Sequence, residues 1–260
     1  MHRYASHCRW MGTLLAALGL RRVTLVAQDW GGLIGLRLAG RDVRGVFVRA
    51  SVSNTVLPDG RFEVQNDFRE WQRWSQGMAP MFDAGEVLQL GTQVTLSDAD
   101  VAAYRAPFPS EEYCAGPREM PMQVPAEEGD AEAPHGRELW DTVFSKLTGF
   151  PFQTAFGGKC KLTPGYEKRF IGAFPGCRHK GVEHTYFPEA GHFTHEDAGT
   201  EWAAAVLAMV AATPLPGYRC AGDPRPAMCD VLRTPEARFA GLAKLGYVEG
   251  FMSSSLSNRA

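Results

Sequence analysis

Two apolar segments with different spacing follow each other at the start of the chain. Residues 4–19 carry apolar side chains three and four positions apart, Trp10 and Leu14 among them, which predicts a helix. Gly19 predicts the end of this helix. Residues 23–27 form a short run rich in β-branched side chains, which is typical of a buried strand. The pattern therefore predicts that a helix leads into a buried strand.

The turn after this strand is the most informative one in the sequence. Asp29 stands between the strand and a second apolar run with helical spacing, residues 33–39, and Gly31 and Gly32 follow it directly. Glycines allow strained backbone angles and close packing of the helix. A strand, a sharp turn and a helix form a nucleophile elbow, where the helix N-terminus keeps a carboxylate ionised. Asp29 is therefore a candidate nucleophile, with an ordinary N-cap aspartate as the alternative.

The residues around this turn resemble those of a known family. Residues 26–32, VAQDWGG, are similar to the elbow of the haloalkane dehalogenases in the α/β-hydrolase superfamily. Gln28 favours that family over the related epoxide hydrolases, which usually carry histidine before the aspartate.

Three more stretches support the same resemblance. Residues 104–116 resemble the end of the family's helical cap, and residues 154–156 resemble the strand that precedes its catalytic acid. Residues 190–197 resemble its catalytic histidine loop. The similarity covers roughly residues 4–212.

The resemblance implies a mechanism and names the residues that carry it. Asp29 would displace halide from a haloalkane and form an ester, and Trp30 would hold the halide through its indole N–H. His192 would act as the general base that activates water, in the chain order of the superfamily. His195 is the second candidate, but its place inside a predicted helix start favours exposure. The implied partners are a small haloalkane and water, with no metal or organic cofactor.

Two further groups of the family's site have no clear match. Thr92 stands where the second halide-binding tryptophan is expected, whereas Trp71 and Trp74 lie earlier on one helix face, where packing is the favoured interpretation. Cys160 stands where the family has its catalytic aspartate, and a thiol does not hold an imidazolium as a carboxylate does. Asp59 is the first carboxylate after the earlier strand and the speculative stand-in. The triad is therefore predicted to be incomplete.

The expected fold class is α/β, a partial α/β-hydrolase fold with a mostly parallel sheet and an inserted helical cap. Core elements are expected in residues 1–58 and 136–214, the cap in 59–135 and a poorly ordered tail in 215–260. Residues 230–239 resemble the family's own N-terminal opening. The family has several strands before its elbow, so we expect N-terminal strands to be missing and one apolar sheet edge to be exposed.

Composition narrows the class of protein. The chain has 260 residues, 45% hydrophobic and 22% charged, with a net charge of -2, which is typical of a globular protein and argues against nucleic-acid binding. No apolar run reaches the roughly 18 residues of a membrane span, and no signal peptide is expected. Six scattered cysteines without a CxxC pair predict free thiols in the reducing cytoplasm.

Three functions stay open on the sequence alone. A haloalkane dehalogenase is the leading hypothesis. An epoxide hydrolase would use the same Asp29 and His192, with Tyr104 and Tyr113 as the available cap tyrosines. The third is an inactive, truncated and poorly soluble member of the family, which the missing strands and Cys160 favour.

Overall fold

The computed structural model describes most of the chain. It covers residues 3–41, 46–62, 64–77 and 82–215. The expected tail, Leu215 aside, and the segment 230–239 lie outside the described residues.

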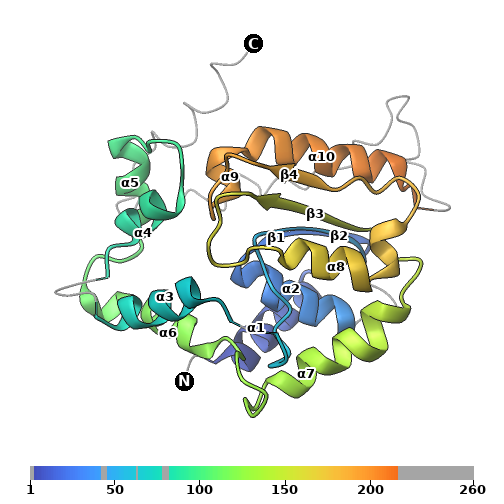
Figure 1. Cartoon of the computed structure of the whole chain (residues 1–260), viewed down its shortest axis with the longest axis horizontal. Coiled ribbons are helices and arrows are strands. Elements are labelled where there is room, and N and C mark those ends of the chain that lie inside the picture. Colours follow the sequence, from blue (N-terminus) through green and yellow to red (C-terminus); the bar gives the residue numbers. More distant parts are fainter. Residues whose placement is uncertain (1–2, 42–45, 63, 78–81, 216–260) are drawn as a thin grey trace. The chain divides into compact units, whose positions relative to one another are not determined.

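A parallel sheet forms the centre of the described part (Figure 1). Its four strands are β1 (Val23–Gln28), β2 (Phe47–Ser53), β3 (Phe152–Gly157) and β4 (Thr185–Phe187), paired in that order. The crossovers include α2 (Trp30–Arg41) between β1 and β2, and α8 (Tyr166–Ala173) between β3 and β4. Parallel strands joined by helices are the α/β architecture that the sequence predicts.

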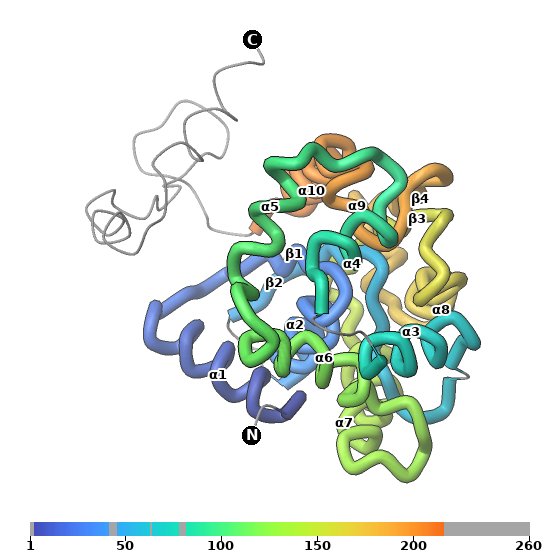
Figure 2. Tube along the Cα trace, turned by 90° about the vertical axis from the view of Figure 1, so that its left-hand side faces the viewer, coloured from blue at the N-terminus to red at the C-terminus, as the bar shows by residue number. Residues whose placement is uncertain are grey.

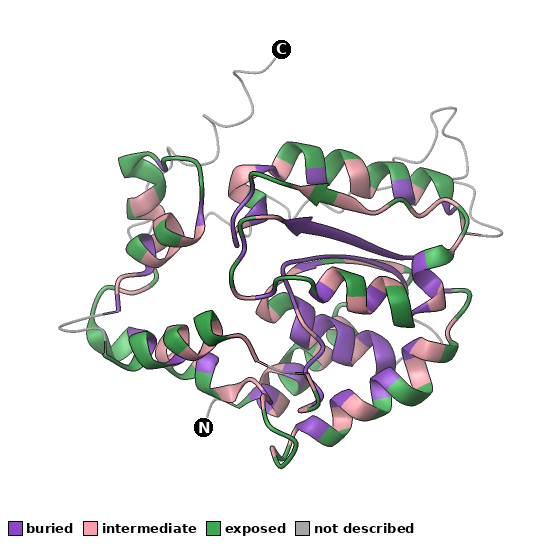
Figure 3. Ribbon diagram, in the orientation of Figure 1, coloured by how far each residue is buried: buried purple, intermediate pink, exposed green. Residues whose placement is uncertain are grey.

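Helices cover both faces of this sheet, and the alternation along β2 shows why. Ala50 and Val52 point into a core shared with α2 and α8, where β2, β3 and much of α2 are buried (Figure 3). Ser51 lies on the opposite face, and there Trp202 of α10 (Gly199–Ala212) donates its indole N–H to the Ser51 hydroxyl at 3.0 Å. Arg49 on the same face donates to a carbonyl of α10 at 3.0 Å. The face of β2 that carries Ala50 and Val52 is thus apolar, whereas the face that carries Arg49 and Ser51 contacts α10 through buried hydrogen bonds.

The chain between β2 and β3 is helical, with no strand among its described residues. Its helices are α3 (Asn66–Gly77), α4 (Ala84–Gly91), α5 (Asp98–Arg105), α6 (Ala115–Glu119) and α7 (Ala133–Glu138). The same stretch has the short 3₁₀ helices η1 (Glu111–Cys114), η2 (Met120–Gln123) and η4 (Phe144–Lys146) and the π-helix η3 (Leu139–Val143); a further 3₁₀ helix, η5 (Pro175–Arg178), follows α8. The cap boundaries at 59 and 135 stay a prediction.

The first helix and strand form where the sequence predicts them, but the strand is less buried than predicted. Helix α1 (Tyr4–Ala17) forms as expected and packs on α2 (Figure 2). Gly19, shortly after the helix ends, takes a left-handed φ of 63°. However, Trp10 and Leu14 are exposed, and Val26 on β1 is 48% exposed. Within the described residues β1 pairs only with β2, so it is an edge strand. The predicted strand at 23–27 is therefore confirmed and its predicted burial is wrong, whereas the expected exposed apolar edge is confirmed within the described residues.

None of the helices in the described part of the chain combines the length and the apolar character that a bilayer crossing requires.

Candidate active site

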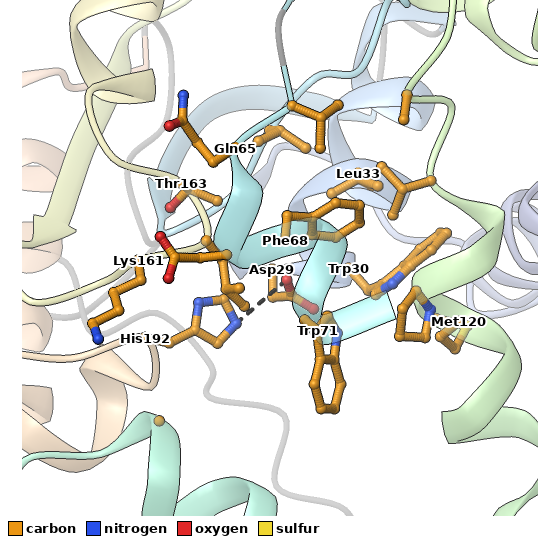
Figure 4. A pocket seen from close by; sticks show the side chains of 18 of the residues that line it. Asp29, Trp30, Leu33, Gln65, Phe68, Trp71, Met120, Lys161, Thr163 and His192 are labelled. Atoms are coloured by element: carbon orange, nitrogen blue, oxygen red, sulfur yellow. Dashed lines mark ion pairs between the residues drawn. The ribbon is translucent and has the colours of Figure 1, made fainter. Parts of the chain in front are cut away.

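Asp29 occupies a strained turn between β1 and α2. Its φ of 47° lies in the left-handed region, which costs free energy for a residue with a Cβ. The N–H groups of Gly32 and Leu33 donate to its carbonyl at 2.8 and 3.2 Å, so α2 begins directly after it. Its carboxylate is partly exposed, and Oδ1 lies 3.4 Å from Nε2 of His192 (Figure 4). This arrangement has the form of a nucleophile elbow and goes beyond what an ordinary N-cap requires.

The glycine after the elbow is required by a close approach. The Thr55 hydroxyl donates to the Asp29 carbonyl at 2.6 Å and so braces the turn. A Cβ on Gly32 would lie only 2.1 Å from that hydroxyl oxygen. The sequence predicts strained angles at the glycines, but the positive φ belongs to Asp29, while Gly31 and Gly32 lie within α2. Gly32 thus supplies space and Asp29 carries the strain.

His192 is buried on the loop between β4 and α9 (Thr194–Asp197), and its backbone is fixed from several sides. Its N–H donates to the Gly91 carbonyl at 2.7 Å. Its own carbonyl accepts from the side chains of Asn54 at 2.8 Å and Gln28 at 3.0 Å. The two ring nitrogens then face different partners: Nε2 faces Asp29, and Nδ1 lies 3.3 Å from Sγ of Cys160. The structure thus brings the two predicted residues together.

Two acidic groups contact the imidazole of His192, Asp29 at Nε2 and Cys160 at Nδ1. Burial lowers the pKa of His192, but the hydrogen bonds with Asp29 and Cys160 outweigh it and raise the pKa to about 10. Burial also raises the pKa of the Cys160 thiol, but the hydrogen bond with His192 holds that pKa below its ordinary value. The contact with Asp29 therefore favours a protonated imidazole at rest, and the contact with that imidazole favours the ionised form of Cys160.

The speculative stand-in for the catalytic acid is a wrong prediction, and Thr92, at the position of the second tryptophan, contacts its own helix. The buried Asp59 carboxylate accepts hydrogen bonds from Arg61 at 2.9 Å and Arg169 at 2.6 Å, while the histidine nitrogen that needs an acid faces Cys160. The Thr92 hydroxyl donates to the carbonyl of Leu88 at 2.7 Å at the end of α4, so a halide cannot use it as a donor. Each group already has another partner, which for Asp59 includes Arg169, 110 residues away in the sequence.

The three tryptophans named in the sequence analysis line the cavity that contains Asp29. Trp30 lines the cavity in front of Asp29, and its ring meets the edge of Tyr4 with centroids 5.3 Å apart. Trp71 and Trp74 line the same cavity and also pack on each other, with centroids 5.4 Å apart.

The tyrosines lie elsewhere. Tyr104 donates its hydroxyl to Glu196, and it also contacts His195, the second histidine candidate. Tyr113 is exposed to solvent. Among the described residues, neither tyrosine lines the cavity that contains Asp29. The arrangement of cap tyrosines that an epoxide hydrolase would need is therefore not formed by these two residues.

Asn54 is the residue of the site that sequence reasoning missed. It is fully buried at the end of β2 and takes a φ of 38°. Its amide nitrogen donates to the carbonyls of Gly191 and His192, each at 2.8 Å, and to the Thr194 hydroxyl at 2.7 Å. Its amide oxygen accepts from the N–H of Gly157 at 2.9 Å. A polar residue at the carboxyl end of a buried parallel strand is the signal that points to such a role.

A cavity of about 980 Å³ opens in front of the elbow. Its wall is mostly apolar, with Leu33, Phe68 and Trp71 among its side chains, and Asp29 and His192 face each other in it (Figure 4). The volume is in the range of small-molecule sites, about 300–1,000 Å³. The site therefore places a carboxylate and an imidazole in a space suited to an apolar ligand.

Comparisons with known proteins agree with this geometry. A family model described as the alpha/beta hydrolase fold matches residues 2–98. A haloalkane dehalogenase from Psychrobacter cryohalolentis is 39% identical over 198 residues, which make up 76% of this chain. One from Mycobacterium marinum is 32% identical over 208 residues, 79% of this chain and 67% of that protein. The chain belongs to the haloalkane dehalogenase family. The family resemblance of residues 26–32 is thereby confirmed.

Solved structures of the dehalogenase family show the same fold. The tetrameric haloalkane dehalogenase DpaA from Paraglaciecola agarilytica superposes with a TM-score of 0.68 at 24% identity, covering 80% of this chain and 67% of that one. A putative ancestral haloalkane dehalogenase superposes with a TM-score of 0.65 at 22% identity, covering 79% and 74%. The chain spans 63% of the length of the Psychrobacter relative. The predicted α/β-hydrolase fold is confirmed.

Proposed function

We propose that this chain carries the active site of a haloalkane dehalogenase, a hydrolase that cleaves carbon–halogen bonds. The observation that carries the proposal is the Asp29 carboxylate on its strained elbow, 3.4 Å from His192 and open to an apolar cavity. The names of the relatives support the same reaction class. Because the chain spans only part of those relatives, the activity is a proposal for this protein.

In the first step, an Asp29 oxygen attacks the carbon that bears the halogen. A carbon–oxygen bond forms, the carbon–halogen bond breaks, and the halide leaves with the bonding electrons. An apolar wall supports this step because it excludes water, which would otherwise solvate the carboxylate and weaken it as a nucleophile. Trp30 is the proposed halide donor, since an indole N–H in a dry cavity stabilises an anion without accepting a proton.

In the second step, water attacks the carbonyl carbon of the Asp29 ester and His192 accepts a proton from that water; the bond from this carbon to the alkoxy oxygen then breaks, and the alcohol leaves with the proton that His192 returns. The electrostatics of the site connect the two steps. The negative charge of Asp29 helps to keep the resting imidazole protonated, with a pKa of about 10. Esterification removes this charge, so the pKa of His192 falls, the imidazolium releases its proton to water, and the neutral imidazole is available as a base. The first step thereby prepares the second.

The cellular setting belongs to the same proposal. The four described cysteines, Cys8, Cys114, Cys160 and Cys177, are free thiols, which supports a reducing compartment such as the cytoplasm. The proposed partners are a small haloalkane and water.

The test is the fate of butyl bromide with four versions of the chain. The unchanged chain should release bromide, and Asp29→Asn should release none. His192→Ala should release one equivalent and keep a butyl group on the peptide that contains Asp29, because the ester forms but is not hydrolysed. His195→Ala is the matched control, since His195 contacts Tyr104 and Glu196 instead of Asp29. Bromide release by folded Asp29→Asn at the unchanged rate would contradict the proposal.

A further inference from the structure

The group behind the general base is a thiol. Cys160 lies on the loop after β3, with Sγ 3.3 Å from Nδ1 of His192 and 3.3 Å from the hydroxyl oxygen of Thr163. The residue is only 5% exposed. Lys161 and Thr163 line the cavity, whereas Cys160 is not among the described residues that do so. The sulfur therefore touches the base and is screened from a molecule in the cavity, so it is placed to orient His192 and not to attack a substrate.

Gln28 indicates which ring nitrogen carries the proton when His192 is neutral. Its amide nitrogen donates to the His192 carbonyl at 3.0 Å and lies 3.2 Å from Nε2 of the ring. A second amide N–H can be donated to Nε2 only when that nitrogen has a free lone pair. The single ring proton is then on Nδ1, which faces the sulfur of Cys160. The sulfur is thus the acceptor at Nδ1, and Nε2, which lies 3.4 Å from Asp29 Oδ1, carries the lone pair that accepts the Gln28 N–H.

We propose that Cys160 acts as a thiolate that positions His192, in place of the carboxylate that the family has there. This inference rests on the proposed function and specifies how the second step works. The thiolate accepts a hydrogen bond from the Nδ1–H group, and the Thr163 hydroxyl, 3.3 Å from the same sulfur, is placed to donate a second one. When His192 takes a proton from water, the thiolate balances the positive charge of the imidazolium. The proton passes from water to Nε2, and Cys160 itself neither gains nor loses one.

A thiolate and a carboxylate differ in one measurable way. A carboxylate stays ionised at neutral pH, whereas an ordinary thiol has a pKa of about 8.5. A protonated Cys160 could donate to Nδ1, which would leave the ring proton on Nε2 and make His192 useless as a base. Ester hydrolysis therefore needs the state in which the Cys160–His192 pair holds one proton. This state gains population as the pH rises.

Other titratable groups near the pair act on it through their charge. They are Asp29 on the elbow, His195 and Asp197 on α9, and Lys159 and Lys161 beside Cys160 on its loop. Asp29 is neutral once it is esterified, and Lys159 pairs with Glu189 at 3.5 Å. The substitutions below leave all of these groups in place, so a change in pH profile reports on Cys160.

The first experiment measures single-turnover hydrolysis of the butyl ester on Asp29 as a function of pH. In Cys160→Asp, the rise of the rate should move to lower pH than in the unchanged chain, because the acid stays ionised. In Cys160→Ser, hydrolysis should slow by about 10²- to 10⁴-fold, the range of general base catalysis, while the ester still forms. Cys177→Ser is the matched control: burial raises the pKa of this thiol to about 12, and it packs in the core away from His192.

The second experiment is independent of turnover. The ultraviolet absorbance of a thiolate should be present in the folded chain at neutral pH, disappear in Cys160→Ser and persist in Cys177→Ser. Equal absorbance in the unchanged chain and Cys160→Ser would overturn the inference, as would the same pH profile in the unchanged chain and Cys160→Asp. If no variant forms an ester on Asp29, the proposed function fails, while the absorbance still decides whether Cys160 is a thiolate.

Discussion

Asp59→Asn should destabilise the fold and leave the chemistry of the site intact. The Asp59 side chain is 0% exposed and its carboxylate pairs with Arg61 and Arg169. Removing one member of a buried ion pair leaves the other charge uncompensated, which costs about 3–5 kcal/mol. Arg169 keeps some contact with solvent and lies over the Trp140 ring at 4.3 Å, so we expect the lower end, about 3 kcal/mol.

The pH dependence of this loss has a definite sign. Burial raises the pKa of Asp59, but the hydrogen bonds and charges of Arg169 and Arg61 outweigh it, so the folded pKa lies below the ordinary value of about 3.9. A carboxylate with a lowered folded pKa contributes its stability above the unfolded pKa and loses it as the pH falls through the folded one. The difference between the unchanged chain and Asp59→Asn should therefore be full at neutral pH and shrink below about pH 4.

Urea unfolding followed by circular dichroism measures this difference. Asp141→Asn is the matched control, because Asp141 also pairs with Arg61 but is 54% exposed, and it should cost at most about 1 kcal/mol. Ester hydrolysis by the folded fraction of Asp59→Asn should equal that of the unchanged chain. A destabilisation no larger than that of Asp141→Asn, or a hydrolysis step that is specifically lost, would refute the structural role assigned to Asp59.

Three shorter predictions concern the elbow and the sheet edge. Asp29→Asn should lower the pKa of His192 from about 10, as measured by NMR titration, because the carboxylate that raises it is gone; an unchanged pKa would contradict the assigned ion pair. Gly32→Ala should lower the free energy of unfolding, measured in urea, by about 1–3 kcal/mol, since its Cβ would collide with Thr55. An unchanged free energy of unfolding would show that the turn can shift to accept the Cβ without cost. Val26→Lys should reduce concentration-dependent light scattering, because a charge on an exposed edge strand opposes pairing with other chains; equal scattering would exclude this edge as the contact.

The elbow could be predicted from the sequence because its signals are local. A strand, Asp29, two glycines and an apolar helix follow one another within residues 23–39. His192 could be predicted because its loop keeps the family's pattern. The strain at Asp29 and the need for Gly32 could not, because both depend on Thr55, which β2 brings to the turn from 26 residues away.

The rest of the site depends on contacts between distant segments. Asp59 could be proposed as an acid because the sequence does not show that Arg169, 110 residues away, neutralises it. The absence of a carboxylate at Cys160 is visible in the sequence, but the contact of its sulfur with Nδ1 of His192 appears only in the fold. Periodicity likewise predicts an apolar face on α1, yet it does not say whether another element covers Trp10.

The most direct test of the central claim is a single turnover of butyl bromide in water labelled with heavy oxygen. If water hydrolyses an ester on Asp29, it attacks the carbonyl carbon, and one labelled oxygen remains in the Asp29 carboxylate. Mass spectrometry of the peptide that contains Asp29 should therefore show one heavy oxygen per turnover, with none in the same peptide from His195→Ala incubated without substrate. Release of bromide with the label only in the butanol would show that water attacks the substrate directly, and would contradict Asp29 as the nucleophile.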